Sequence, residues 1–260
     1  MRHVASLWIG ARLGEIERAA IASFLRLGHA FTLYGYGAIG NLPAGVTLAD
    51  ASEILPGDSI LRDRRSGSPA MHADLFRYAM VRATDALWVD LDMIALRPFD
   101  FDTPWVLGRE DDGQLNNAVL GLPRESRLLA SLCAITPATR GVPPHLRGLR
   151  RQKYRLRSAL RGGLPITEWP WGSTGPRALT HFATLTGDVG RAMPPQAFYP
   201  VPIHAVRRFL TPGALRPEDL PADSFGVHLW GRELRAELAG SFGGRVPRGS
   251  FLDLIRAEGA

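Results

Sequence analysis

The sequence holds one cysteine, one lysine and no long apolar run, and each scarcity excludes a class of protein. The lone Cys133 can form neither an intramolecular disulfide nor a cysteine-rich metal cluster, and its apolar setting favours a buried helix position. No apolar stretch approaches the roughly 20 residues of a membrane-spanning helix, and the run at 86–89 ends at a carboxylate. Charged residues follow the N-terminus too early for a secretory signal. We therefore expect a cytoplasmic protein.

Positive charge is in excess, yet nearly all of it is arginine. The net charge is +6, and Lys153 is the only lysine among 31 basic residues, a skew that genome base composition can also produce. One basic cluster stands out at residues 147–161, containing Arg147, Arg150, Arg151, Lys153, Arg155, Arg157 and Arg161. It suits a solvated helix face, an anionic membrane surface, a phosphorylated acceptor or RNA. Because interleaved aromatic residues are absent, we expect no nucleic acid partner and keep peripheral contact with the inner membrane as a hypothesis.

Short apolar runs alternate with helical patterns in the first third of the chain. Strands are expected at 3–9 and 30–36, separated by a helix over 15–27 that ends at Gly28. A further helix begins after Ser68 and Pro69, and a very apolar strand follows at 86–89. This alternation predicts an α/β fold with a mostly parallel central sheet flanked by helices.

The remaining two thirds are less regular. We expect a short turn or helix at 50–55, strands at 105–108, 118–122 and 225–230, and helices over 125–135, from Ser173 and from Ser250. A stretch rich in Pro, Gly and Arg at 137–170 is long for a structureless connection and indicates a functional insert or lid. Neither a repeat nor a linker divides the chain, so we expect a single domain over 1–260.

The most informative carboxylates are Asp90 and Asp92, which lie within the otherwise apolar segment WVDLDMIAL. A buried, unpaired carboxylate is costly, so a cation or hydrogen-bond donors must compensate it. Spacing of two places both side chains on one side of an extended segment, where they can address one ion. Oxygen ligands suit Mn²⁺ or Mg²⁺, which commonly bind together with substrate phosphates.

The longer string ADLFRYAMVRATDALWVDLDMIALRPFD, at 73–100, resembles a known signature. It is similar to the sugar-binding region of DXD glycosyltransferases of the capsular-polysaccharide, α-1,4-galactosyl and initiating mannosyl type, which are family 32-like and related to clostridial glucosylating toxins. The segments SLWIG near the N-terminus, NNAVLG after the carboxylates, WGSTGP at 171–176 and VHLW near the C-terminus follow in the family's order. Asp85-Ala86 replaces a frequent Gly-Gly, and 137–170 matches no part of the family.

The resemblance implies a GT-A fold and a role for each matched residue. Catalytic roles fall to Asp90, Asp92 and Asn117, and the metal ligands are Asp92 and His228. Donor binding is assigned to Trp8 (stacking on the base), Ile9, Asp74, Arg77, Asp90, Asn116 and Trp230 (through its indole N–H to the diphosphate). Glu110 and Asp111 are supporting candidates.

The function so implied is metal-dependent transfer of a hexose from a nucleoside diphosphate sugar, UDP favoured over GDP, to an acceptor hydroxyl with retention of configuration. Mn²⁺ or Mg²⁺ is the expected cofactor, and a glycan or a lipid-linked molecule in bacterial surface polysaccharide or glycolipid synthesis is the expected acceptor. The two carboxylates also suit a metal-dependent phosphohydrolase or nucleotidyltransferase acting on a nucleotide or sugar phosphate, or a binding protein that has lost its chemistry.

Several residues have structural alternatives. Trp8 and Trp230 also suit core aromatics, and His228 a hydrogen-bonded core histidine. The string GYGAIG at 35–40 has the spacing of a dinucleotide-binding loop, but it follows the second strand, and the NLPAG after it interrupts the helix that such a loop requires.

Overall fold

The computed structural model describes residues 2–258 and contains eight strands and eight α-helices in that range. The strands are β1 (Val4–Trp8), β2 (Phe31–Gly35), β3 (Val46–Asp50), β4 (Leu87–Val89), β5 (Met93–Ala95), β6 (Val106–Arg109), β7 (Leu115–Gly121) and β8 (Gly226–His228). The helices are α1 (Glu15–Arg26), α2 (Ala70–Ala83), α3 (Arg127–Cys133), α4 (Gly148–Ala159), α5 (Pro176–Thr186), α6 (Pro195–Phe198), α7 (Gly231–Phe242) and α8 (Phe251–Glu258). Short 3₁₀ turns are η1 (Ala51–Glu53), η2 (Ile166–Glu168), η3 (Val189–Arg191), η4 (Ile203–Phe209) and η5 (Pro217–Asp219).

The central sheet has six strands in the order β3-β2-β1-β4-β7-β6. The first four are mutually parallel, whereas β7 runs antiparallel to both β4 and β6. Strands β5 and β8 form a separate antiparallel pair. The predicted α/β fold with a mostly parallel sheet is therefore confirmed. The single-domain organisation stays a prediction.

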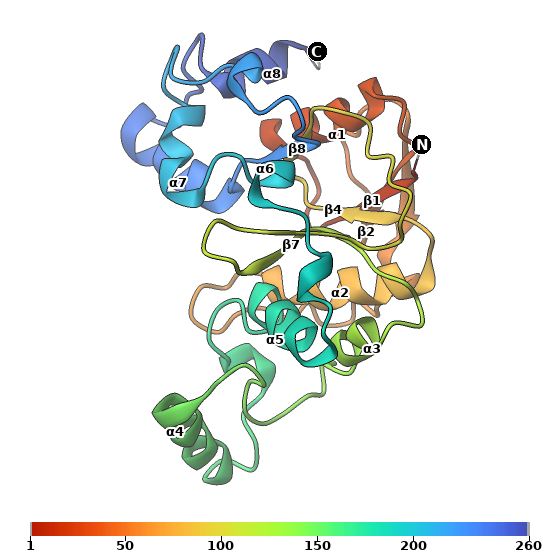
Figure 1. Cartoon of the computed structure of the whole chain (residues 1–260), viewed down its shortest axis with the longest axis vertical. Coiled ribbons are helices and arrows are strands. Elements are labelled where there is room, and N and C mark those ends of the chain that lie inside the picture. The colour runs from red at the N-terminus through yellow and green to blue at the C-terminus, as the bar shows by residue number, and fades with distance from the viewer. Residues whose placement is uncertain (1, 259–260) are drawn as a thin grey trace.

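Helices cover both faces of the sheet (Figure 1), with α1 on one face and α2, α3 and α5 on the other. Alternate strand residues pack into two different cores: Val4 belongs to the core under α1, and Ala5 to the core over α2. Because both faces are buried, the strands are continuously apolar, which is why the pattern for 86–89 was strong in the sequence.

Local signals place the helix ends. Acidic Glu15 and Glu17 lie in the first turn of α1, where they complement the helix dipole. Pro69 precedes α2 and Pro176 is the first residue of α5, a position that needs no backbone N–H. Gly187 ends α5 with φ of 80°, a left-handed conformation that glycine adopts without strain.

Strands β3 and β5 were not predicted: β3 is a partly exposed edge strand, and β5 has three residues. The segment 137–170 contains α4 and η2, and its role as a functional insert or lid stays a prediction. The arginine-rich part of this segment forms the regular helix α4, which has no buried residue.

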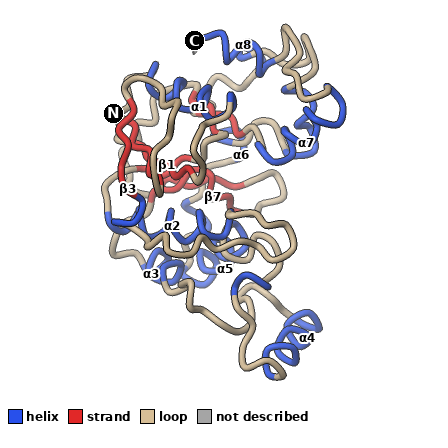
Figure 2. Tube along the Cα trace, turned by 180° about the vertical axis from the view of Figure 1, so that it is seen from behind, coloured by secondary structure: helices blue, strands red, loops and turns tan. Residues whose placement is uncertain are grey.

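Helix α4 extends away from the sheet and its covering helices (Figure 2). Every residue of α4 is described, and none is buried. Among residues 2–258, no helix combines the length and apolar character that crossing a bilayer requires.

Candidate functional site

Two carboxylates and an imidazole meet where the parallel strands end. Asp90 follows β4, and Asp92 lies in the turn between β4 and β5. In the antiparallel pairing of β5 with β8, Met93 lies opposite His228. His228, 136 residues after Asp92, is thereby placed beside that turn. Oxygen and nitrogen atoms of Asp90, Asp92 and His228 lie within 4.8 Å of one another. The prediction that Asp90 and Asp92 lie on an extended segment is wrong, because the Met93 N–H donates to the Asp90 carbonyl across a turn. The two carboxylates nevertheless lie close together.

The Asp92 carboxylate is held ionised by its neighbours. His228 Nε2 lies 3.1 Å from Asp92 Oδ1, and the Gly231 N–H donates to Oδ2 at 2.6 Å. Burial opposes ionisation, but the charge and hydrogen bond of His228 outweigh it and lower the pKa of Asp92 to about 2. Burial likewise disfavours charged His228, yet the Asp92 carboxylate raises the pKa of that imidazole. The pair therefore holds a proton that a bound cation can replace.

Asp90 is a carboxylate of a different character. Burial raises its pKa to about 6, although Arg77 Nη1 lies 2.9 Å from its Oδ1 and favours the charged form. The Trp88 indole N–H also donates to Asp90 Oδ1, at 2.7 Å. The pKa values of Asp90 and Asp92 are thus shifted in opposite directions, although the two carboxylates lie close together. Such strongly shifted pKa values are typical of functional sites.

Arg77 connects Asp90 to a second carboxylate on its own helix. Asp74 lies one turn earlier on α2, and its Oδ1 is 3.4 Å from Arg77 Nη2. The guanidinium also donates to the Asn117 carbonyl of β7, and packs 4.8 Å from the centre of the Trp88 ring. One buried cation therefore joins α2, the end of β4 and β7, where Asp74, Arg77, Asp90 and Asn116 of the predicted donor-binding set lie.

Side chains from three elements fix the orientation of Asp74. Thr174 Oγ1 donates to Asp74 Oδ2 at 2.8 Å, and Asn117 Nδ2 donates to Oδ1 at 3.0 Å. The backbone of Gly175 comes so close that a Cβ there would lie 2.7 Å from Asp74 Oδ2. The resemblance had assigned Asn117 to the site, but the interaction between Asp74 and Thr174 was missed.

These residues border two adjoining cavities of about 190 and 710 Å³, which together we call the cleft. The smaller cavity is lined by Asp74, Arg77, Asn117 and residues of the segment 166–176, and the larger by Asp92, Trp230 and the start of α7. Both share Ala70, Asp90, Asn116, Trp171, Gly172, Pro176 and His228. Asp90 and His228 thus border both cavities, whereas Asp92 borders only the larger one.

Asn116 brings a further acid to the cleft. Its Nδ2 donates to Glu110 Oε1 at 2.8 Å, and its Oδ1 accepts from the Ala118 N–H. Burial raises the pKa of Glu110, although the bond from Asn116 acts in the opposite direction. Both side chains line the larger cavity, so Glu110 is positioned to contact a bound hydroxyl.

The remaining predicted residues lie at the margins. Trp8 and Ile9 are at the carboxyl end of β1, outside the residues that line the cleft, and the Trp8 indole N–H donates to the Arg12 carbonyl. Trp230 borders the larger cavity, but its indole N–H donates to the Val201 carbonyl at 2.8 Å. Their roles in donor binding stay predictions.

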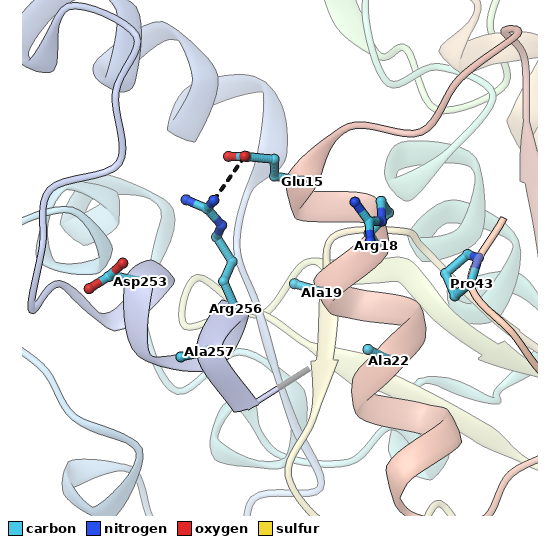
Figure 3. A pocket seen from close by; sticks show the side chains of 8 residues that line it. All are labelled: Glu15, Arg18, Ala19, Ala22, Pro43, Asp253, Arg256 and Ala257. Atoms are coloured by element: carbon cyan, nitrogen blue, oxygen red, sulfur yellow. Dashed lines mark hydrogen bonds and ion pairs between the residues drawn. The ribbon is translucent and has the colours of Figure 1, made fainter. Parts of the chain in front are cut away.

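A separate pocket of about 350 Å³ lies between α1 and α8, where Arg256 pairs with Glu15 (Figure 3). Its lining is largely alanine, arginine and single acids, and it contains none of the cleft residues. We therefore place the chemistry in the cleft.

The ligand set fits a divalent cation with mixed oxygen and nitrogen preference. Asp92 and Asp90 offer oxygens and His228 offers Nε2, while Nδ1 of that ring is buried without a hydrogen-bond partner among residues 2–258. Carboxylate oxygens suit Mn²⁺ and Mg²⁺, and Mn²⁺ or Mg²⁺ at this cluster stays a prediction. Two acids with opposite pKa shifts beside a histidine are consistent with that assignment.

The start of α7 was missed as part of the site. Trp230 has a φ of 54°, and among the described residues 2–258 it is the only non-glycine residue with a positive φ. This strained conformation aims the N–H of Gly231, the first residue of a 12-residue helix, at Asp92. A glycine directly after VHLW, followed by the helical pattern GRELRAEL, was the available signal.

Replacing Gly231 with alanine should weaken metal binding at least tenfold. The new Cβ would lie 2.8 Å from Asp92 Oδ2 and 3.0 Å from Arg235 Nη1, so the carboxylate has to move. Calorimetric titration of Mn²⁺ measures the effect. Gly240→Ala on the same helix is the matched control, because its Cβ meets open space, and it should leave affinity unchanged and add about 1 kcal/mol of stability. Equal affinities for both variants would contradict a role for Gly231.

Comparisons with known proteins identify no family. A scan against family models finds no match, and a search of curated proteins finds none either. Among solved structures, the chain is similar to one described as the apo structure of WbbM, a bifunctional glycosyltransferase, at 14% identity and a TM-score of 0.30. That similarity covers 46% of this chain and 27% of the other.

Proposed function

We propose that this protein is a metal-dependent glycosyltransferase that moves a sugar from a nucleoside diphosphate sugar, UDP favoured over GDP, to an acceptor hydroxyl. The observation that carries the proposal is the convergence of Asp90, Asp92 and His228 within 4.8 Å, in a cleft that also contains Asp74 and Arg77. The α/β sheet fits the GT-A type that the sequence motifs imply, and ligands of such sheets bind at the carboxyl ends of the strands.

Asp92 and His228 would hold the metal, with Asp90 beside them. Mn²⁺ or Mg²⁺ in that position would supply a positive charge for the diphosphate that leaves the donor. The N-terminus of α7, which lines the same cavity with Arg232 and Arg235, adds partial positive charge from its backbone N–H groups. These groups favour negative charge in the part of the cleft where the metal ligands lie.

Asp74 and Asn117 would orient the donor sugar. Both side chains are buried and line the smaller cavity, and their mutual hydrogen bond fixes the angle at which each faces it. Hydroxyl groups are recognised well by such a fixed carboxylate and amide. Arg77 holds Asp74 and Asp90 at a constant separation, so that sugar and diphosphate sites keep their relative positions.

The acceptor would enter past Trp171, whose side chain is 40% exposed where the two cavities meet. Transfer with retention forms a bond from the acceptor oxygen to the anomeric carbon on the face from which the diphosphate departs. The bond from that carbon to the diphosphate oxygen breaks, and the hydroxyl proton passes to the departing oxygen. A glycan or lipid-linked hydroxyl of bacterial surface polysaccharide synthesis is the proposed acceptor.

Calorimetric titration of UDP and GDP into the purified protein tests this proposal. With Mn²⁺ present, one nucleotide should bind, and removal of the metal by EDTA should weaken that binding at least 100-fold, because the diphosphate then meets uncompensated carboxylates. Failure of both nucleotides to bind to folded protein would reject the transferase and favour a metal-dependent phosphohydrolase. Hydrolysis of sugar phosphates would then be the next assay.

A further inference from the structure

Helix α4 carries a line of leucines that no part of the described chain covers. Leu149, Leu156 and Leu160 are 82%, 63% and 77% exposed. Their spacing of seven and four residues places Leu149, Leu156 and Leu160, the last of them the residue that ends the helix, along one side of α4, which we call the leucine ridge. Single exposed leucines are ordinary, but three aligned on a helix without a buried residue form an interaction surface.

The ridge is surrounded by positive charge. Residues 147–161 contain seven basic side chains and no acid. Lys153 lies one turn from both Leu149 and Leu156, directly beside the ridge. An amphipathic helix with leucines on one side and cations around them is the pattern of a helix that lies in the interface of an anionic bilayer.

The attachment of α4 leaves the ridge free. Arg157 and Arg161 pair with Glu168 at the base of the segment, and Arg64 from a separate loop joins the same carboxylate. Glu168 thus links Arg157 of α4, and Arg161 just after the helix, to the loop that carries Arg64. Leu149, Leu156 and Leu160 make no part of that contact and face solvent.

We propose that α4 docks on an anionic lipid bilayer, with the leucine ridge inserted at the headgroup boundary and its cations on lipid phosphates. The charge of the helix argues against a second copy of the chain, because two such helices would bring Arg150, Arg151, Lys153 and Arg155 of each copy, none of them in an ion pair with an acid of residues 2–258, against one another. The ridge argues against RNA, since leucines gain nothing on a phosphate backbone.

Docking would place the cleft at the bilayer. The segment 160–165 connects α4 to Ile166, Trp169 and Trp171, which line the smaller cavity. A helix fixed on the membrane therefore holds the cleft near the lipid headgroups. Resting on the proposed function, this identifies the acceptor as the sugar or hydroxyl headgroup of a membrane lipid.

Co-sedimentation with vesicles tests docking without any assay of transfer. The full chain should bind vesicles containing about 30% phosphatidylglycerol in phosphatidylcholine, and bind pure phosphatidylcholine at least tenfold less. The variant L149S/L156S/L160S should lose binding to the anionic vesicles by at least tenfold. Its thermal midpoint should match the wild type, because these leucines contribute nothing to the cores.

Leu185→Ser is the matched control, since Leu185 is 65% exposed on α5 and away from the ridge. It should bind vesicles as the wild type does. Docking is rejected if the wild type ignores anionic vesicles at low salt, or if the triple variant binds them fully. It is also rejected if the wild type is a dimer that the triple variant loses, because a second copy would then cover the ridge. Nucleotide titration of the triple variant distinguishes failure of docking from failure of the proposed function. The triple variant should bind the nucleotide with the affinity of the wild type, because its substitutions lie outside the cleft.

Discussion

Asp92→Asn should abolish Mn²⁺-dependent nucleotide binding and lower the rate of sugar transfer by at least about 1,000-fold. The asparagine side chain keeps the size of aspartate, and its oxygen can still accept the Gly231 N–H that now bonds Asp92 at 2.6 Å. The negative charge is lost, however, and with it the partner of His228 and the strongest anionic ligand of the cluster. Calorimetry with Mn²⁺ and nucleotide measures binding, and release of free nucleoside diphosphate from the donor measures turnover.

Asp85→Asn provides the matched control. The Asp85 side chain is 95% exposed and pairs with Arg124 on the surface, so the same chemical change there should alter neither binding nor turnover. A variant at position 92 that folds normally and still binds Mn²⁺ and nucleotide as the wild type does would show that Asp92 is no metal ligand. Circular dichroism and the thermal midpoint establish the folded state of both variants.

The elements of the sheet that pack on both faces were predictable from sequence, because burial makes their residues uniformly apolar. The expected runs at 3–9, 30–36 and 86–89 correspond to β1, β2 and β4. Strand β3 escaped prediction since it is an edge strand with exposed residues, and so it has a weaker apolar signal. For α4, a solvated helix face was one of several interpretations of residues 147–161, because its exposed leucines leave a basic sequence without a core-facing pattern.

The site was predictable to the extent that its residues adjoin in sequence. Asp74 and Arg77 share a helix face, and Asp90 and Asp92 share a turn. His228 came from the resemblance, and its place beside Asp92 depends on the pairing of β5 with β8. The contacts of Thr174 with Asp74 and of Gly231 with Asp92 could not be predicted in the same way. They join residues 100 and 139 positions apart, which only tertiary packing brings together.

Arg77→Met should cost about 3–5 kcal/mol of folding free energy and also prevent donor binding. Arg77 is 6% exposed and is the cation that both Asp74 and Asp90 contact. Methionine fills much of the same volume but leaves the buried Asp74 and the partly buried Asp90 without this counter-charge. Denaturant unfolding at pH 7.5 in EDTA measures the loss, and Arg82→Met, at an exposed position on the same helix, should change stability by less than about 0.5 kcal/mol.

The loss should shrink at lower pH, which separates charge from packing. Burial already raises the pKa of Asp90 to about 6, and removal of Arg77 raises it further. An acid with a folded-state pKa above its unfolded value costs stability when ionised, and that cost falls as pH drops below the folded value. The difference between wild type and Arg77→Met should therefore be smaller at pH 5 than at pH 7.5. A difference that stays constant with pH would mean that Arg77 acts through packing against Trp88, and not as the counter-charge of the two carboxylates.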